Sequence, residues 1–242
     1  MLRSRLAPVL LALPLAAAPL FQPGTAPANS APFASAVTPS APTSQASLLP
    51  QPPADSKLVI AGDSSLRSVV EQLGESTGVL FRADGETWSL LDDLPCGLDR
   101  TAEIDGGDAW RFLNDLLLGN QLYIGALRMN EPFLLEILPS RTDVRERVAR
   151  SFPLSLTTDQ LEAFGDYTAF MVQVSFAVQF VDANHVAHAL RGSRTDDDVS
   201  YVISAGPSAV LATGPLRIVD AIGDGVRAAD EAERVRWELQ QK

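Results

Sequence analysis

The sequence predicts an α+β protein, with two small mixed-sheet α/β domains in tandem after a signal peptide and a disordered Pro/Ala-rich tether. Three observations predict this class. Residues 1–53 hold eleven of the seventeen prolines and not one carboxylate. From residue 57 onward, short apolar or alternating runs follow segments with the i, i+3, i+4, i+7 spacing of amphipathic helices. This succession occurs twice, and a charged break over 141–149 separates the two occurrences.

The N-terminal segment has the order of a secretory signal peptide, so we expect an exported protein of the periplasm or cell envelope. Arg3 and Arg5 precede a short apolar run, and small residues follow it. The run is too short for a membrane span and three prolines interrupt it. Ala-x-Ala sites predict cleavage after Ala18 or after Ala28. The predicted segments are a signal peptide over 1–28 and a disordered Ala/Pro/Ser-rich linker over 29–56.

The rest of the chain is acidic. All thirty Asp and Glu residues follow the leader, against seventeen of the nineteen Lys and Arg residues. Nucleic acids and anionic lipids attract basic surfaces, so this charge balance argues against both as partners. Cys96 is the only cysteine, which excludes an internal disulfide. We expect a buried thiol there, with a disulfide to another chain as the alternative.

The first predicted domain spans 57–140. Its clearest helix has an apolar stripe formed by Leu66, Val69, Val70 and Leu73. A second helix, with Trp110 facing the core, lies between the turn at 105–108 and Gly119. The predicted strands are 58–60, 79–81, 98–104, 121–126 and 133–138, with an irregular stretch before the third. We expect the order β-α-β-β-α-β-β, with both helices against one face of a single mixed sheet.

The second predicted domain spans 150–230 and follows a linker over 141–149. Its longest strand, 172–181, alternates between apolar and polar residues, and a helix follows from Asp182 to Gly192. A last helix begins at Pro215, a favoured first helical residue. The other predicted elements are strands over 150–156, 199–204 and 209–213, a short helix over 158–164, and a charged tail over 231–242 that can extend the last helix.

Two long segments carry a family resemblance. The segment VSFAVQFVDANHVAHALRG, followed by VSYVISAGPSAVLATGPLRIVDAIGDGV, resembles the periplasmic N-terminal repeat of secretins, the outer-membrane channels of type II and related secretion systems. The segments LRSVVEQLGESTGVLF and DAWRFLNDLLLGNQLYI are similar to the domain that precedes this repeat, which also occurs as the signalling domain of TonB-dependent receptors. Ala205-Gly206 departs from the Asn usual in the family. A secretin continues into a β-barrel gate, whereas this chain stops at Lys242, so we expect no channel from it alone.

The resemblance implies a non-enzymatic protein-interaction module without a cofactor. The implied partners are proteins of a secretion or pilus machinery, either a secretin channel subunit or a second copy of this chain. Exposed strand edges offer unpaired backbone groups that a neighbouring domain can complete. We therefore expect the strands over 133–138 and 199–204 to make the contacts. The expected interaction residues are Phe133, Leu135, Ile137, Val199, Tyr201 and Ile203.

Other chemistry-bearing residues form no complete site in the sequence. His185 and His188 have the i, i+3 spacing of metal ligands, but zinc needs further ligands and the chain has no other histidine. Asp196-Asp197-Asp198 lacks the spacing of a calcium loop. No metal, cofactor or catalytic residue is predicted. The alternatives are an envelope signalling domain, a carbohydrate or peptidoglycan binder or hydrolase that uses Trp88 and an acidic cleft, and a structural spacer.

Overall fold

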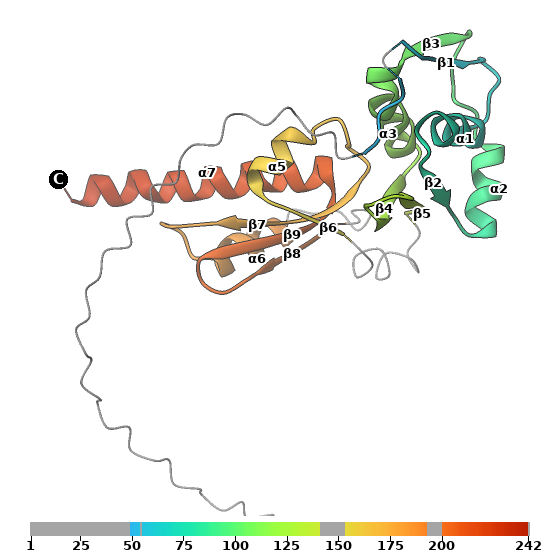
Figure 1. The fold of residues 1–242 in the computed structure, drawn as a ribbon. Coiled ribbons are helices and arrows are strands. Elements are labelled where there is room, and N and C mark those ends of the chain that lie inside the picture. The colour runs from blue at the N-terminus through green and yellow to red at the C-terminus, as the bar shows by residue number, and fades with distance from the viewer. Residues whose placement is uncertain (1–48, 54, 141–152, 193–199, 242) are drawn as a thin grey trace, which may run out of the picture. The chain divides into compact units, whose positions relative to one another are not determined.

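The computed structural model describes residues 49–53, 55–140, 153–192 and 200–241. The expected signal peptide, most of the expected linker, the break at 141–149 and the interaction residue Val199 lie outside these residues. Helices alternate with short strands in the described part, which confirms the predicted α+β class (Figure 1).

Residues 57–140 contain two sheets with helices between them. Two helices have the expected residues in the core: Leu66, Val69, Val70 and Leu73 from the first, and Trp110 from the second. The elements are β1 (Lys57–Ile60), α1 (Leu66–Thr77), β2 (Leu80–Arg82), α2 (Gly85–Asp93), β3 (Ala102–Asp105), the 3₁₀ turn η1 (Gly106–Asp108), α3 (Ala109–Gly119), β4 (Leu122–Arg128) and β5 (Leu134–Pro139).

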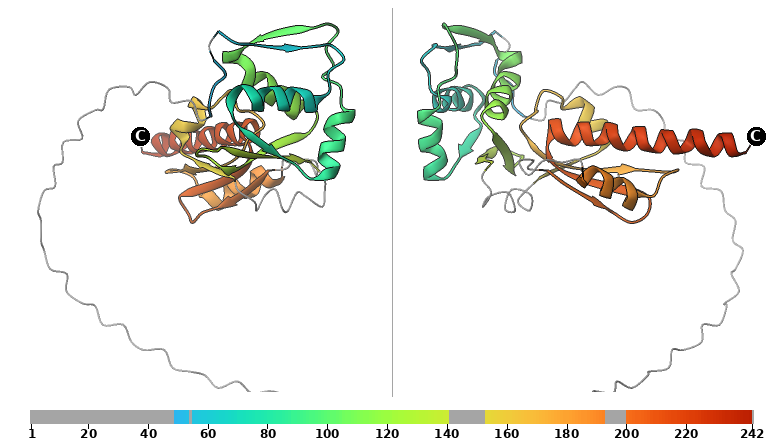
Figure 2. Two further views of the ribbon diagram at one scale, coloured as in Figure 1. Left: turned by 45° about the vertical axis from the view of Figure 1, so that its right-hand side comes forward. Right: turned by 180° about the vertical axis from the view of Figure 1, so that it is seen from behind.

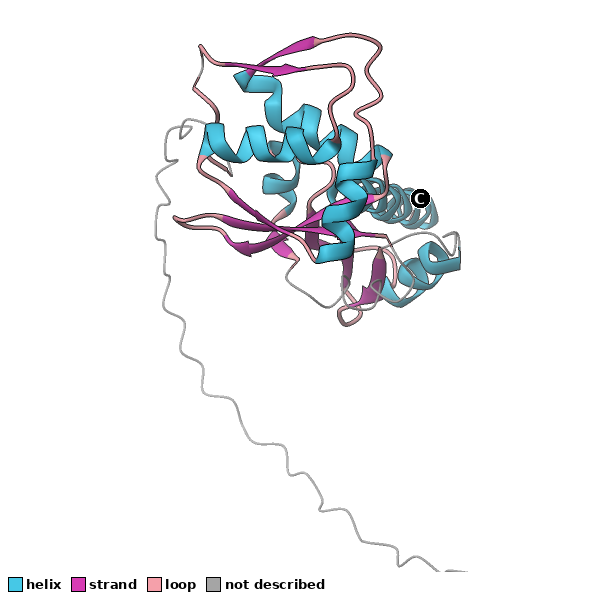
Figure 3. Ribbon diagram, turned by 90° about the vertical axis from the view of Figure 1, so that its right-hand side faces the viewer, coloured by secondary structure: helices cyan, strands magenta, loops and turns pink. Residues whose placement is uncertain are grey.

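The expectation of a single sheet with both helices on one face is wrong. β1 pairs antiparallel with β3 alone, whereas β2, β5 and β4 form a separate mixed sheet in that order. α1 and α3 contact strands of both sheets, and Figure 3 shows the layer of helices between them. Alternating residues predict that a segment is a strand, but they do not say which other strand it joins.

The stretch around Trp88, expected to be irregular, is the helix α2. It begins where the side chain of Asp84 accepts a hydrogen bond of 2.7 Å from the backbone N–H of Thr87. Thr87 and Leu91 are its only buried residues. With so few residues in the core, this nine-residue helix lacks the apolar stripe by which α1 is predicted.

The second predicted domain contains a four-stranded sheet in the order β6-β7-β9-β8. β6 is parallel to β7, and the other neighbours are antiparallel. Both α6 and α7 contact this sheet and each other. The elements are β6 (Leu154–Leu156), α5 (Thr158–Ala163), β7 (Met171–Ala177), α6 (Ala183–Gly192), β8 (Tyr201–Ser204), β9 (Ala209–Pro215) and α7 (Leu216–Gln240).

The last helix, α7, is 25 residues long and includes the charged tail up to Gln240. Its last buried residue is Val226, and the helix continues past the end of the sheet (Figure 2). Exposed ion pairs follow one another along this portion: Arg227–Asp224, Arg234–Glu231, Arg234–Glu238 and Arg236–Glu233. Pairs of this kind, three or four residues apart, each stabilise a helix modestly.

Buried contacts join the two predicted domains. Asn114 of α3 has no exposed surface, its Nδ2 donates to the carbonyl of Trp110 (2.8 Å), and its Oδ1 accepts from the backbone N–H of Ala169 (3.0 Å). The aromatic rings of Trp110 and Tyr167 lie with their centroids 6.1 Å apart. The described residues of both domains therefore share one hydrophobic core, while the domain boundaries stay a prediction.

Residues 49–53, here called the N-terminal strap, contact both predicted domains. The Trp110 indole N–H donates to the carbonyl of Pro50 (2.9 Å), and Gln51 Nε2 donates to the hydroxyl of Tyr167 (3.0 Å). Leu49 is almost fully buried. The strap is thus part of the fold, although the sequence predicts a disordered linker over these residues.

Candidate functional site

The strand β8 lies at one edge of the four-stranded sheet. Its side chains alternate between the two faces. Val202 is fully buried, whereas Tyr201 is 52% exposed and Ile203 half-buried. Tyr201 pairs with Thr213 of β9, and Ile203 with Leu211. The predicted edge at 199–204 is therefore present over its described residues, and Tyr201 is its most exposed large apolar side chain.

The backbone of β8 offers hydrogen-bonding groups on its outer side. Just beyond β8, the N–H of Ala205 donates to the carbonyl of Ala209 at 2.8 Å. Opposed residues of an antiparallel pair alternate between bonded and non-bonded positions. Ile203 and Tyr201 consequently bond to β9, while the N–H and C=O groups of Val202 and Ser204 point away from it. Among the described residues no strand pairs with that side.

The other predicted contact strand does not offer a free edge. β5 is the central strand of its sheet, with β2 on one side and β4 on the other. Leu135 and Ile137 are buried in the core, and the carbonyl of Phe133 accepts the N–H of Leu80 at 2.9 Å. This corrects the expectation of an exposed edge at 133–138; any part that Phe133, Leu135 and Ile137 take in binding stays a prediction.

The edges of that sheet are β4, where Ile124 bridges to Phe170, and β2, which has a groove beside it. Leu80 is 53% exposed there, next to the half-buried rings of Phe81 and Trp88. Two carboxylates, Glu71 and Glu75, also line the groove. We call this feature the β2 groove; it is lined by Val70, Glu71, Gly74, Glu75, Gly78, Val79, Leu80, Phe81 and Trp88.

Arg67 lies next to the β2 groove. Its guanidinium lies over the Trp88 ring, 5.2 Å from the centroid. It also donates to Glu71 Oε1 (2.7 Å) and Asp92 Oδ2 (2.8 Å), and these hydrogen bonds raise the pKa of Arg67. Trp88, which the carbohydrate-binding alternative would use, is half-buried. The exposed tryptophan is Trp237, at 53%, while Trp110 is in the core as predicted.

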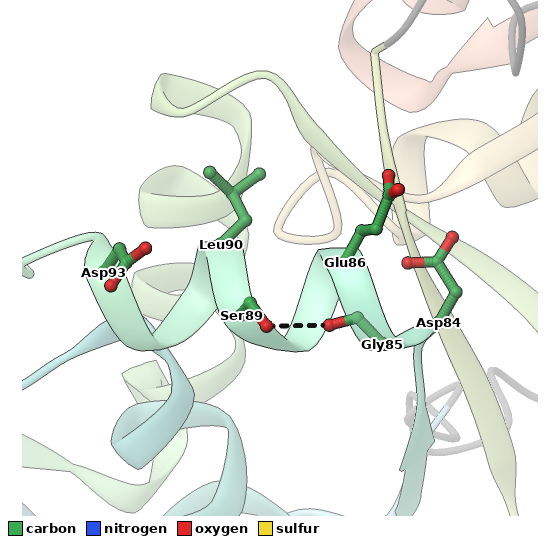
Figure 4. A pocket seen from close by; sticks show the side chains of 6 residues that line it. All are labelled: Asp84, Gly85, Glu86, Ser89, Leu90 and Asp93. Carbon is green, nitrogen blue, oxygen red and sulfur yellow. Dashed lines mark hydrogen bonds between the residues drawn. The ribbon is translucent and has the colours of Figure 1, made fainter.

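An open acidic hollow follows the outer side of α2. Asp84, Glu86 and Asp93 contribute its carboxylates, and Figure 4 shows Asp84 and Asp93 at opposite ends of the helix. Ser89 Oγ donates to the carbonyl of Gly85 (3.0 Å), and Asp84 caps the helix. Ser89 and Asp84 thus serve the helix itself, and no aromatic side chain of the described residues lines the hollow.

The two histidines lie exposed on α6. Within the part of the chain that the structure describes, no group of three or more His, Cys, Asp or Glu side chains could hold a metal ion. Asp182 accepts from the backbone N–H (2.8 Å) and the Nδ2 (3.0 Å) of Asn184, and these hydrogen bonds lower its pKa. The run Asp196–Asp198 lies outside the described residues.

Cys96 is buried, as the sequence predicts, and forms no disulfide. Burial raises the pKa of its thiol. A thiol with a raised pKa holds less of the reactive thiolate at neutral pH. None of the helices in the described ranges has the length and apolar content that crossing a membrane requires.

Asp230 forms a contact that sequence reasoning missed. Its Oδ1 accepts hydrogen bonds from three successive backbone N–H groups after β7, those of Gln179 (2.9 Å), Phe180 (2.7 Å) and Val181 (3.1 Å). Burial raises the pKa of Asp230, but the three hydrogen bonds together outweigh burial and lower it. About fifty residues separate donors and acceptor, so no local motif points to the contact.

Comparison with known proteins gives likeness in fold alone. No protein-family model matches the chain, and no curated protein matches it. Solved structures of similar fold include the GspC–GspD complex of the type II secretion system of enterotoxigenic Escherichia coli, with 11% identity, a TM-score of 0.25, and coverage of 73% of this chain and 99% of that one.

Two further similar structures contain secretins or their complexes. The N-terminal domain of the secretin XcpQ from Pseudomonas aeruginosa has 11% identity and a TM-score of 0.24, with 72% of this chain and 66% of that chain covered. The Klebsiella pneumoniae outer membrane complex of PulD, PulS and the PulC HR domain has 13% identity and a TM-score of 0.47. That match covers 70% of this chain and 26% of the other. Sequence identities and TM-scores as low as these give no basis for assigning a function.

Proposed function

We propose that this protein is a non-enzymatic interaction module of the cell envelope that contacts or assembles with a protein secretion or pilus channel. The exposed edge of β8 is the observation that carries the proposal. It combines outward-pointing backbone groups at Val202 and Ser204 with the exposed side chain of Tyr201. The sequences of both domains resemble those of secretin N-terminal domains, and this resemblance supports the choice of partner.

The mode of contact is addition of a strand from the partner to β8. Main-chain hydrogen bonds supply affinity in such contacts, and alternate side chains supply specificity. Tyr201 and Ile203 lie on one face of the sheet, so a partner strand would place its own alternate side chains beside them. Unlike a buried strand, β8 needs no rearrangement of the described core to accept it.

In-cell crosslinking tests this proposal. A photo-crosslinking residue replaces Tyr201 in the tagged full-length protein, and mass spectrometry identifies what co-purifies from the envelope fraction. We expect a secretin subunit or a platform protein of the same machinery. The same residue at Arg217, an exposed position of α7, is the control and should capture neither. Recovery of only this chain or of wall fragments from the Tyr201 position would overturn the proposal.

A matched pair of substitutions distinguishes the β8 edge from the β2 edge. Tyr201→Lys places a charge on β8, and charges on edge strands discourage pairing. Leu80→Lys makes the same change on β2 at an almost equal exposure, 53% against 52%. We expect Tyr201→Lys to reduce recovery of the partner by about ten-fold or more, and Leu80→Lys to leave it unchanged. Circular dichroism checks that both variants keep the wild-type fold.

Carbohydrate binding is the second candidate, and the β2 groove is the observation that favours it. Aromatic rings and carboxylates line this groove together, which are the residue types expected of a sugar-binding cleft. Against it, Arg67 already covers the Trp88 ring and pairs with Glu71. Wall fragments recovered in the crosslinking experiment, and lost in Leu80→Lys, would favour this function over the first.

A further inference from the structure

Exposed apolar side chains gather at the C-terminal end of α7. Among the described residues, seven large hydrophobic side chains are exposed, and four of them belong to this region: Phe180, Val235, Trp237 and Leu239. Scattered single apolar residues on a surface need no explanation, but a cluster marks an interaction site. The helix here is beyond its last buried residue, Val226, and extends past the sheet (Figures 1 and 2).

Two of the four residues are accounted for within the domain. The rings of Phe180 and Trp237 lie 6.2 Å apart, next to the segment that Asp230 holds. Val235 and Leu239 remain, at 43% and 66% exposure. They lie on a different face of the helix, because Trp237 is about 200° from Val235 around the axis at 100° per residue.

Val235 and Leu239 belong to a regular stripe, which we call the α7 seam. Its residues are Ala228, Ala232, Val235 and Leu239, and all four are exposed. Their spacing of four, three and four residues is that of the a and d positions of a coiled coil. Ala221 and Gly225 continue the spacing toward the N-terminus, but there α6 approaches: a side chain at Gly225 would meet Leu190 Cδ2 at 3.2 Å. The unobstructed seam therefore begins at Ala228.

The charges beside the seam favour a parallel second copy. Taking Ala232 as a, Glu231 and Glu238 occupy g positions and Arg236 an e position. In a parallel pair, a g residue faces the e residue five positions later on the other helix, which brings Glu231 opposite Arg236. In an antiparallel pair the g positions face one another, so glutamates would oppose glutamates. The present partners of Glu231 and Arg236 are exposed neighbours on the same helix, and such pairs contribute little.

We propose that the α7 seam is an interface between two copies of this chain, which pair in parallel and in register through Ala228, Ala232, Val235 and Leu239. The alanines let the helices approach closely near the domains, and Val235 and Leu239 fill the interface further out. Three helical turns bury less than the roughly 1,200 Å² of a stable interface. The association is accordingly weak and depends on concentration. The proposal does not rest on the channel partner, since no residue of the seam belongs to β8.

Disulfide crosslinking tests the orientation. In the full chain, Val235→Cys places one thiol at the same level of each helix, and mild oxidation should give a covalent dimer. Arg227→Cys, exposed but off the seam, is the matched control and should stay monomeric. The buried Cys96 remains in both variants and in the wild type, which should not crosslink. A disulfide found only when Ala232→Cys and Val235→Cys chains are mixed would reveal antiparallel pairing and overturn the proposal.

Sedimentation of the unoxidised protein tests the energetics. Leu239→Glu puts a like charge at the same level of both helices, and we expect the dimer dissociation constant to rise about ten-fold or more. Trp237→Ser, on the same helix but off the seam, should change it little. An equal effect of both variants would show that the whole apolar patch, not the seam, associates. A wild-type chain that stays monomeric at concentrations on the order of 0.5 mM would also overturn the proposal.

Discussion

Gly223 shows how closely α7 is packed at the scale of a single residue. A Cβ at this position would lie 2.5 Å from Cε1 and 2.7 Å from Cζ of Phe176, a buried ring on β7. Real Cβ atoms do not approach ring carbons so closely. An interior glycine lowers the stability of a helix, but here it lets α7 pack closely against the sheet.

We expect Gly223→Ala to lower the free energy of unfolding by about 1–2 kcal/mol, because overpacking of the core outweighs the better helix propensity of alanine. Gly119→Ala is the control, since no neighbouring atom lies within 4 Å of its Cβ position. That change should stabilise by up to about 1 kcal/mol. Urea unfolding measures both. A Gly223→Ala chain as stable as the wild type would contradict the packing argument.

Among the secondary-structure elements, α7 and the turn after β7 are joined by Asp230. Three backbone N–H groups that no strand partner satisfies converge on one carboxylate oxygen. Because a carboxylate is a strong acceptor only while ionised, this contact depends on pH. The Phe180–Trp237 ring contact lies beside it, so the carboxylate also positions the apolar end of the helix.

We expect Asp230→Ala to destabilise the protein by about 1–2 kcal/mol at neutral pH. The folded-state pKa of Asp230 is lowered, so this contribution is full above the ordinary pKa near 4 and is lost as the pH falls through the lowered value. The difference between wild type and variant should therefore vanish in acid. Chemical unfolding at a series of pH values measures it. Asp224→Ala, which removes only an exposed ion pair, should cost little at every pH.

Elements with a repeated apolar spacing could be predicted from the sequence, and those without it could not. α1, α3, α7 and the alternation of β7 follow from local patterns, and all are present. α2 was missed because only Thr87 and Leu91 reach the core. The separation of β1 and β3 into their own sheet, and the central position of β5, depend on pairing between distant segments. The sequence predicts the strand edge at β8. It does not predict the hydrogen bonds that Asp230 accepts, nor the α7 seam.

At the scale of the whole molecule, the buried side chain of Asn114 links the two predicted domains. It satisfies the N–H of Ala169, which has no exposed surface. Removing the amide leaves that buried donor without a partner, a loss that costs more than the net value of the bond itself. The shared aromatic contact of Trp110 with Tyr167 lies close by.

We expect Asn114→Ala to lower the stability of both predicted domains together, by about 2–3 kcal/mol. Hydrogen exchange of the amides in β4–β5 and in β7–β9 measures each domain separately, and protection should fall in both. Asn120→Ala is the control, because its Nδ2 donates only to Leu116 of the same helix, and it should cost less than about 1 kcal/mol. Loss of protection confined to one domain would show instead that the two unfold independently.

The N-terminal strap determines how this fold would bear mechanical force. A tensile load from the N-terminal side first meets the buried side chain of Leu49. It then reaches Pro50 and Gln51, which hydrogen-bond to Trp110 and Tyr167 respectively. The two anchors follow one another along the strap, so the load would reach them one after the other rather than together. Only after both have released would the load act on the ladder between β1 and β3. The strap would thus be the first part of the fold to release, and its release would remove the hydrogen bonds that it makes to both rings of the Trp110–Tyr167 contact.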